Sequence, residues 1–184
     1  DLSSLFKVMI GMDYDSLALG SIHPTDKQSV YYAKSDAMKL PLQDCSVDVV
    51  ICAQVYEHVP DSSRLFNEIH RILRPGGIVY FSGPNWLFPI EPHYFIPFLH
   101  WLPEKWANSV LKLIGASESY YERSSSSRYL RRQLRGFSIY DMTPALLHSD
   151  HLVRNALLRS SIRRVPQWLW RFLGPLHPNF NWIL

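Results

Sequence analysis

The sequence predicts an α/β fold built on a doubly wound, mostly parallel sheet. Three observations carry this prediction. The run VDVVICAQVY at 47–56 is almost continuously apolar, as is typical of a strand buried on both faces of a parallel sheet. The segment at 61–73 is apolar at helical spacing, and IVYFSG at 78–83 follows it after a Pro-Gly-Gly joint. Strand, helix and strand with short joints form a βαβ unit, whose right-handed crossover makes the two strands parallel.

The segments upstream of this unit continue the same alternation. LFKVMIGMD at 5–13 predicts a buried strand, SLALGSI at 16–22 a short helix, and SVYYAKSD at 29–36 a second strand. A loop containing Pro41 leads from there to the strand at 47–56. The first half of the chain therefore reads as successive parallel strands with helices between them.

The predicted helix at 61–73 carries its own start and stop signals. Asp61 or Ser62 can serve as the N-cap, Pro75 cannot continue the helix, and Gly76 and Gly77 allow a tight reversal. Its apolar residues at helical spacing, which we expect to face the core, are Leu65, Phe66, Ile69, Ile72 and Leu73.

The second half is less regular, because residues 84–122 are crowded with proline and aromatic residues. A helix is expected within this stretch at 104–115. The remaining expected elements are a basic helix at 126–136 stopped by Gly136, a short strand within 136–142, helices at 145–164 and 166–176, and a last strand at about 181–184.

Composition is that of a globular protein, with 47% hydrophobic and 19% charged residues. No signal peptide is evident, and no apolar stretch reaches the roughly 18 residues that a membrane-spanning helix needs. Cys45 and Cys52 are expected to be free thiols in a reducing cytosol, because a strand between them would hold their Cα atoms too far apart for a disulfide.

Charge is divided unevenly along the chain. Residues 123–184 contain ten Arg, no Lys and two Asp, whereas residues 1–122 contain nine Lys or Arg and fourteen Asp or Glu. This asymmetry is typical of a basic region with an anionic neighbour, such as a membrane surface, a phosphorylated substrate or a nucleic acid. A solvated helix face is an equally acceptable explanation.

The stretch SDAMKLPLQDCSVDVVICAQVYEHVPDSSRLFNEIHRILRPGGIVYFSGPN resembles the class I S-adenosylmethionine (SAM) dependent methyltransferases of the methyltransferase type 11 group. The similarity lies in the order of an Asp-Ala before LP, a polar turn entering a strand, EHV leaving it, and EIHRILRPGG. With VMIGMD upstream, it covers about residues 6–85. It implies a Rossmann-like sheet with an antiparallel last strand, SAM as the cofactor, and one methyltransferase domain over residues 1–184. Within that domain, residues 84–122 would be a substrate-covering insertion and residues 123–184 a basic C-terminal completion.

One part of the family pattern has no counterpart here. Members of the family open with a strand and an acidic, glycine-rich loop that wraps the cofactor at a helix N-terminus. Nothing before Leu5 supplies that strand or loop. We therefore expect the 184 residues to be a fragment that holds only part of a cofactor site and is inactive by itself, and we expect two strands to expose their edges.

The resemblance assigns the remaining cofactor contacts to strand ends. Asp13 would accept hydrogen bonds from the ribose hydroxyls, and Asp36 would accept one from the adenine amino group. A backbone N–H of Ala37 or Met38 would meet an adenine ring nitrogen, and Gln54 would line the methionine end. The alternatives are an ordinary polar strand end for Asp13 and a plain turn residue for Asp36.

Two histidines are candidates for acid–base chemistry. His58 could take a proton from the methyl acceptor, and His93 in the aromatic insertion could orient or deprotonate an acceptor hydroxyl. The alternatives are that Glu57 and His58 tie down the following helix, and that His93 only packs in a cover. Acceptor contacts are predicted at Tyr56, Asn85 and Tyr94. No histidine, cysteine or acidic residues have the spacing of metal ligands, so no metal is expected.

These expectations favour a methyltransferase that acts on a small or lipid-linked acceptor, at oxygen, in the cytoplasm. Tryptophan beside arginine in the tail suits peripheral contact with the inner face of a membrane, although the same tryptophans could pack as the domain's own cover. A non-catalytic interaction module with the methyltransferase fold is the first alternative. An RNA methyltransferase is the second, but no RNA-binding motif supports a nucleic acid as the partner.

Overall fold

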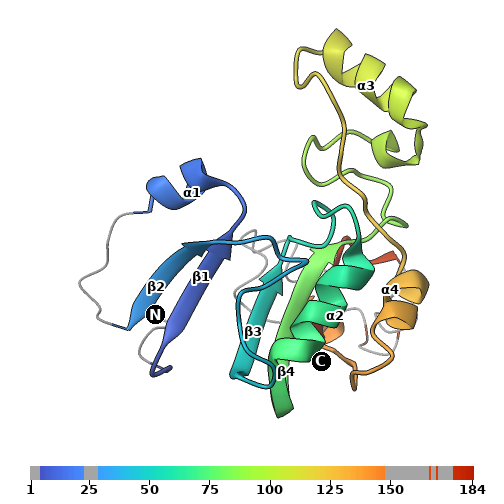
Figure 1. Ribbon diagram of the computed structural model, residues 1–184. Helices are drawn as coiled ribbons and strands as arrows, with labels where there is room; N and C mark the ends of the chain where they lie inside the picture. The colour runs from blue at the N-terminus through green and yellow to red at the C-terminus, as the bar shows by residue number, and fades with distance from the viewer. Residues whose placement is uncertain (1–4, 23–28, 148–165, 167–168, 170–175) are drawn as a thin grey trace.

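The computed structural model describes residues 5–22, 29–147, 166, 169 and 176–184 (Figure 1). Its strands form two separate sheets, one of two strands in the order β1-β2 and one of four strands in the order β3-β4-β6-β5. Strands β1 to β4 point in the same direction in Figure 1, and the segment after β4 rises beyond the end at which they finish. The doubly wound α/β prediction is confirmed in its element order and its strand directions.

The first sheet pairs β1 (Met9–Asp13) with β2 (Val30–Lys34) in parallel. Between them in sequence lies the short helix α1 (Ser16–Gly20), as predicted. Asp15 is its N-cap, because its carboxylate accepts a hydrogen bond from the backbone N–H of Leu17 at 2.7 Å. This cap fixes the direction in which the chain leaves the end of β1.

The second sheet contains the predicted βαβ unit. Strand β3 (Val47–Ala53) runs parallel to β4 (Leu73–Pro84), and helix α2 (Ser62–Ile72) connects them. Asp61 caps α2 by accepting hydrogen bonds from the backbone N–H groups of Ser63 and Arg64, at 3.0 and 3.3 Å. Gly76 has φ +79°, so the backbone after the helix uses the left-handed region that the Pro-Gly-Gly sequence predicted.

The end of the chain completes this sheet. Strand β6 (Asn179–Ile183) is antiparallel to β4 and to the two-residue strand β5 (Tyr140–Asp141). The prediction of an antiparallel last strand is therefore confirmed, with a start two residues earlier than expected.

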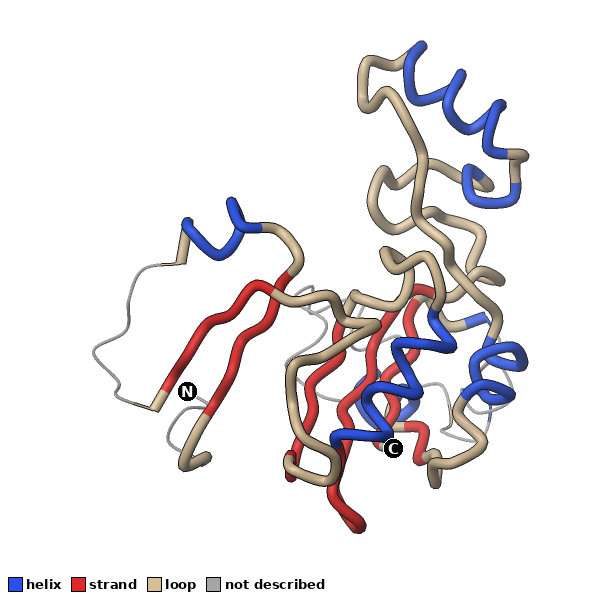
Figure 2. The backbone as a smooth tube through the Cα atoms, viewed as in Figure 1, coloured by secondary structure: helices blue, strands red, loops and turns tan. Residues whose placement is uncertain are grey.

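The two sheets stand next to each other without a shared strand (Figures 1 and 2). Among the described residues, β1 pairs only with β2, and β3 pairs only with β4. Apolar side chains on both are consequently open to solvent: Ile10 is 44% exposed and Ile51 is 52% exposed. The expectation of exposed strand edges is met among the described residues. The expectation that residues 5–13 form a buried strand is wrong, because β1 spans only Met9–Asp13 and its side chains are exposed or half-buried.

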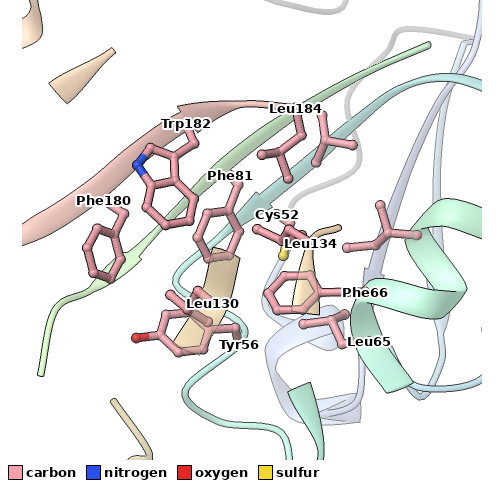
Figure 3. Close-up of a cluster of buried hydrophobic side chains, with 12 residues drawn as sticks. Cys52, Tyr56, Leu65, Phe66, Phe81, Leu130, Leu134, Phe180, Trp182 and Leu184 are labelled. Carbon is pink, nitrogen blue, oxygen red and sulfur yellow. The ribbon is translucent and has the colours of Figure 1, made fainter. Parts of the chain in front are cut away.

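The core lies around β4, between α2 and the C-terminal elements (Figure 3). Phe81 is fully buried, with its ring centroid 5.5 Å from that of Phe66 on α2 and 5.6 Å from that of Trp182 on β6. Leu130 of α4 (Ser127–Gln133) closes the same cluster. Burial of each such side chain contributes roughly 1.5–3 kcal/mol, so this cluster stabilises the second sheet.

The insertion forms a second, smaller core beyond the end of β4. It contains the 3₁₀ turn η2 (Leu99–Trp101) and helix α3 (Glu104–Leu113), as the sequence predicted for the helix. Leu99, Ala107, Leu111 and Tyr120 are buried together. Figure 1 shows this segment projecting away from the sheet, connected to it at the ends of β4 and α4.

Three C-terminal expectations need comment. Helix α4 ends at Gln133, so Gly136 does not stop it; a Cβ at Gly136 would lie 3.0 Å from Nε2 of His70, so a larger residue there would press against that ring. Helix α5 (Thr143–Leu147) begins the segment predicted as a helix over 145–164, and the rest of that helix lies outside the described residues. The predicted helix at 166–176 lies almost wholly outside them as well.

Of the helices described, none has both the length and the apolar character needed to cross a bilayer.

Candidate functional site

The expected cofactor residues stand at the ends of the first two strands and build tight turns there. Asp13 accepts a hydrogen bond from the N–H of Asp15 at 2.8 Å, and Asp36 accepts one from the N–H of Met38 at 2.8 Å. Asp36 is exposed. Each carboxylate keeps an oxygen with further acceptor capacity, which a ribose or an amino group could use. The N–H of Met38, however, is already bonded within the turn, so of the two predicted N–H donors Ala37 is the better placed.

Gln54 follows β3 in a strained backbone conformation. Its φ is +55°, in the left-handed region that non-glycine residues rarely occupy. The conformation is held by the hydrogen bond that its N–H donates to the carbonyl of Ser82 at 2.8 Å. The side chain is exposed at the carboxyl end of the strand. Such strain persists where the surrounding structure over-determines it, often next to ligands. The cofactor contact of Gln54 stays a prediction.

Tyr56 and Asn85 are structural rather than available to an acceptor. Tyr56 is 1% exposed, and its hydroxyl donates to the carbonyl of Pro84 and accepts from the N–H of Ser125. Asn85 is buried and donates to the carbonyl of His177 at 2.7 Å. Both side chains join β4 to the segments that follow it. The geometry therefore speaks against the acceptor contacts expected at Tyr56 and Asn85, because their polar atoms are committed inside the protein.

Glu57 is the most unusual side chain in this region. It is 0% exposed, and neither of its carboxylate oxygens has a hydrogen-bond partner in the described structure. Burial raises the pKa of Glu57 to about 7; its own backbone N–H and His93 oppose this, while nearby Glu122 acts in the same direction as burial. A buried carboxyl without partners is costly as an anion. The site can therefore hold a proton here near neutral pH.

The two candidate histidines meet beside Glu57. The ring centroids of His58 and His93 are 5.3 Å apart in an edge-to-face arrangement, although the residues are 35 positions apart in sequence. Nε2 of His58 lies 3.8 Å from Oε1 of Glu57, too far for a hydrogen bond. Burial lowers the pKa of His58, and so does the proximity of His93. The structure thus brings together the two histidines that the sequence could only name separately.

His93 has a partner of its own in Glu91. Nδ1 of His93 is 2.8 Å from Oε1 of Glu91, a residue that is 0% exposed. The other carboxylate oxygen of Glu91 accepts the N–H groups of His93 and Tyr94 at 2.8 and 2.6 Å. Tyr94, a predicted acceptor contact, is half-buried and its ring centroid lies 6.3 Å from that of Tyr120.

We call Glu57, His58, Glu91, His93 and Glu122 the acid–base group. Its three glutamates are all buried, and among the described residues no Lys or Arg forms an ion pair with any of them. The potential metal-ligand atoms of Glu57, His58 and His93 lie within 4.8 Å of one another, close enough that a metal ion could be held there. Reasoning from ligand spacing along the chain missed this, because two segments far apart in sequence contribute to it.

A hollow of about 290 Å³ adjoins the acid–base group. It is lined by residues of the insertion and of the segment that returns from it: Trp86, His100, Leu102, Glu104 and residues 120–124. Glu122 belongs to both the hollow and the acid–base group, and the ring of Tyr121 lies 6.0 Å from that of His58. This volume is near the lower end for small-molecule sites, so it could take a small acceptor or the end of a larger one.

Comparison with known proteins identifies the family. Residues 1–81 match the profile of a family described as "Methyltransferase domain". An uncharacterized methyltransferase from Mycobacterium sp. strain KMS is 45% identical over 62 residues, which are 34% of this chain and 25% of that protein. A probable SAM-dependent methyltransferase from Mycolicibacterium smegmatis is 36% identical over 84 residues, 46% of this chain and 32% of that protein. The matched part thus spans about a quarter to a third of these curated relatives.

The fold is similar over a longer stretch. The crystal structure of a SAM-dependent methyltransferase from Mesorhizobium loti superposes with a TM-score of 0.58 at 18% identity, covering 96% of this chain and 79% of that one. At this identity the likeness concerns the fold alone, and it extends beyond β4 into the second half of the chain. Residues 1–81 are therefore similar to the methyltransferase type 11 family, and the chain has the Rossmann-like fold of SAM-dependent methyltransferases.

Proposed function

We propose that this chain forms part of an enzyme that transfers the methyl group of SAM to an oxygen atom of a small or lipid-linked acceptor. The observation that carries the proposal is the acid–base group, which follows the carboxyl end of β3 and adjoins the hollow. Asp13, Asp36 and Gln54 lie at or directly after the carboxyl ends of β1, β2 and β3, which point in the same direction (Figure 1). Ligands of open α/β sheets bind at the carboxyl ends of parallel strands.

The cofactor would lie across the ends of β1, β2 and β3. Asp13 would bind the ribose hydroxyls, Asp36 the adenine amino group with Ala37 beside it, and Gln54 the methionine end. SAM supplies an activated methyl group on a sulfonium, and direct displacement needs the acceptor oxygen in line at about 3 Å. The protein's task is then to position the acceptor, exclude water and remove one proton.

The acid–base group favours a hydroxyl as the acceptor. A neutral hydroxyl must lose a proton as its oxygen is methylated, and His58 and His93 both lie where that proton could go. Exposed aromatic side chains of the insertion, Phe95 and Trp106 among them, support a lipid-linked acceptor or contact with a membrane surface. The protein would then act in the cytoplasm, at the inner face of the membrane.

Equilibrium dialysis with radiolabelled SAM tests the first half of this proposal. Saturable binding to the protein expressed from its complete coding sequence is expected, and no binding at millimolar SAM would refute the proposal. Release of S-adenosylhomocysteine is then measured with a panel of hydroxylated small molecules and with a lipid extract. Binding without turnover on any of these would favour the non-catalytic module, and turnover only on RNA would favour an RNA methyltransferase.

A further inference from the structure

The segment that follows β4 is organised around one buried carboxylate. Glu91 is fully buried; its Oε2 accepts the backbone N–H groups of His93 and Tyr94, and its Oε1 lies 2.8 Å from Nδ1 of His93. Its backbone is held as well: its N–H donates to the carbonyl of Ile96 at 3.1 Å, and its carbonyl accepts from Phe95 at 2.8 Å. Glu91 therefore sets the position of the His93 imidazole in two ways, through the backbone N–H of His93 and through its ring nitrogen Nδ1.

This contact decides which nitrogen of His93 carries the proton. With Glu91 as a carboxylate, which only accepts hydrogen bonds, Nδ1 is the donor in the contact of 2.8 Å. In the neutral ring the lone pair is then on Nε2. When Nε2 takes a proton, the negative charge of Glu91 balances the positive charge of the ring. His93 is thus arranged as a proton acceptor before any ligand arrives.

His58 lacks such an arrangement. Its distance of 3.8 Å to Glu57 leaves it without an orienting hydrogen bond from that carboxyl, and burial lowers its pKa. Of the two imidazoles, whose centroids are 5.3 Å apart, His93 is the one with a carboxyl group within hydrogen-bond distance of its Nδ1. The other titratable groups around the pair are Glu57 before α2, Tyr94 on the same segment, and Tyr120, Tyr121 and Glu122 on the segment that returns from α3.

We propose that Nε2 of His93 accepts the proton of the acceptor hydroxyl, and that Glu91 is the positioning residue that fixes the tautomer of His93 and balances its charge. The inference rests on the proposed methyl transfer and names the proton acceptor within it. A lone pair of the acceptor oxygen forms the new bond to the methyl carbon, the bond between that carbon and sulfur breaks, and its electron pair stays on sulfur in S-adenosylhomocysteine. The proton of the hydroxyl passes to Nε2 and leaves to solvent, to which the side chain of His93 is 27% exposed.

The tautomer can be measured without an acceptor. In nitrogen-15 labelled protein, long-range correlation spectra of the histidine rings distinguish a protonated Nδ1 from a protonated Nε2. We expect His93 as the Nδ1–H tautomer, with its ring proton far downfield because of the bond to a carboxylate. Assignment is by His93→Asn, which must remove this signal, and by His58→Asn, which must leave it in place. A neutral His93 protonated at Nε2, or a downfield signal that belongs to His58, overturns the proposal.

The role of Glu91 is tested with Glu91→Gln and with Glu118→Gln as a matched control, since Glu118 is an exposed glutamate of the same insertion and does not line the hollow. Loss of the downfield signal only in Glu91→Gln is expected, and its persistence overturns the assignment. If that variant fails to fold, the wild-type spectrum still decides the tautomer. Once an acceptor is found, His93→Asn should lower kcat about 10²- to 10⁴-fold with SAM binding unchanged. Absence of SAM binding in the wild type would sink the proposed function but not the tautomer, so the two failures are distinguishable.

Discussion

Replacing Glu57 by Gln should change how the stability of the protein depends on pH. Glu57 is fully buried without hydrogen-bond partners, and burial raises its pKa from 4.5 to about 7. A carboxyl whose pKa is higher in the folded than in the unfolded state binds more protons when folded between those two values. The free energy of unfolding therefore falls as pH rises from about 4.5 to 7 and is at its full value below this window.

The size of the effect follows from the size of the shift. Each pKa unit corresponds to about 1.36 kcal/mol, so the change from 4.5 to about 7 lowers the free energy of unfolding by about 3 kcal/mol across the window. Glutamine has the same shape and does not ionise. Glu57→Gln should therefore match the wild type near pH 4 and exceed its free energy of unfolding by about 3 kcal/mol at pH 8.

Urea unfolding of both proteins at a series of pH values from 4 to 8 measures this difference directly. Glu118→Gln is the matched control, because Glu118 is an exposed glutamate of the insertion. Its replacement should leave the pH dependence unchanged. Parallel curves for the wild type and Glu57→Gln would refute the reasoning. They would mean that Glu57 is charged when folded and has a partner, such as a cation or a bound water.

Three further predictions follow from the site and its surroundings. Asp13→Ala should weaken SAM binding by about 1.5–3 kcal/mol, or roughly 10- to 150-fold in Kd by calorimetry, as expected for hydrogen bonds to a charged group; an unchanged Kd removes Asp13 from the cofactor site. Cys45, which is exposed, should react with a thiol reagent at pH 8 long before Cys52, since burial raises the pKa of Cys52 to about 12; equal rates measured by mass spectrometry would contradict this. Chelation with EDTA should leave the melting temperature unchanged, because a Glu57 that holds a proton is a poor metal ligand; a lower melting temperature restored by Zn²⁺ would show a resident metal.

The secondary structure of the central βαβ unit could be predicted because its signals are local. Asp61 does cap α2, and the apolar residues of 61–73 do face the core, since cap chemistry and helical spacing depend only on neighbours in sequence. The basic helix and last strand were found for the same reason. Gly136 was misread as a helix stop because its true constraint is contact with His70, from another part of the chain.

The acid–base group could be predicted only in part, because its members come from three separate segments. His58 and His93 stood out by residue type, and their meeting at 5.3 Å depends on how the insertion folds back on the sheet. The sequence did not predict that three glutamates of this group are buried: Glu57, Glu91 and Glu122. Glutamates are ordinarily exposed, and no local sequence pattern indicates their burial here. The one available signal was the pattern E-x-H at 91–93, which places a carboxylate within reach of a histidine ring.

The unpaired strand edges predict that the chain self-associates. Strands β1 and β3 each have one edge without a partner among the described residues, and both carry exposed apolar side chains, including Ile10 and Ile51. Unpaired edges of this kind promote pairing with other chains. The 184-residue chain expressed alone should therefore self-associate as its concentration rises, and sedimentation velocity measures this. Ile10→Lys and Ile51→Lys together should reduce the association, because charge on an edge strand opposes pairing, whereas Leu113→Lys on exposed α3 should not. A monomer at all concentrations would show that the two edges are already covered, and the separation of the two sheets would then be wrong.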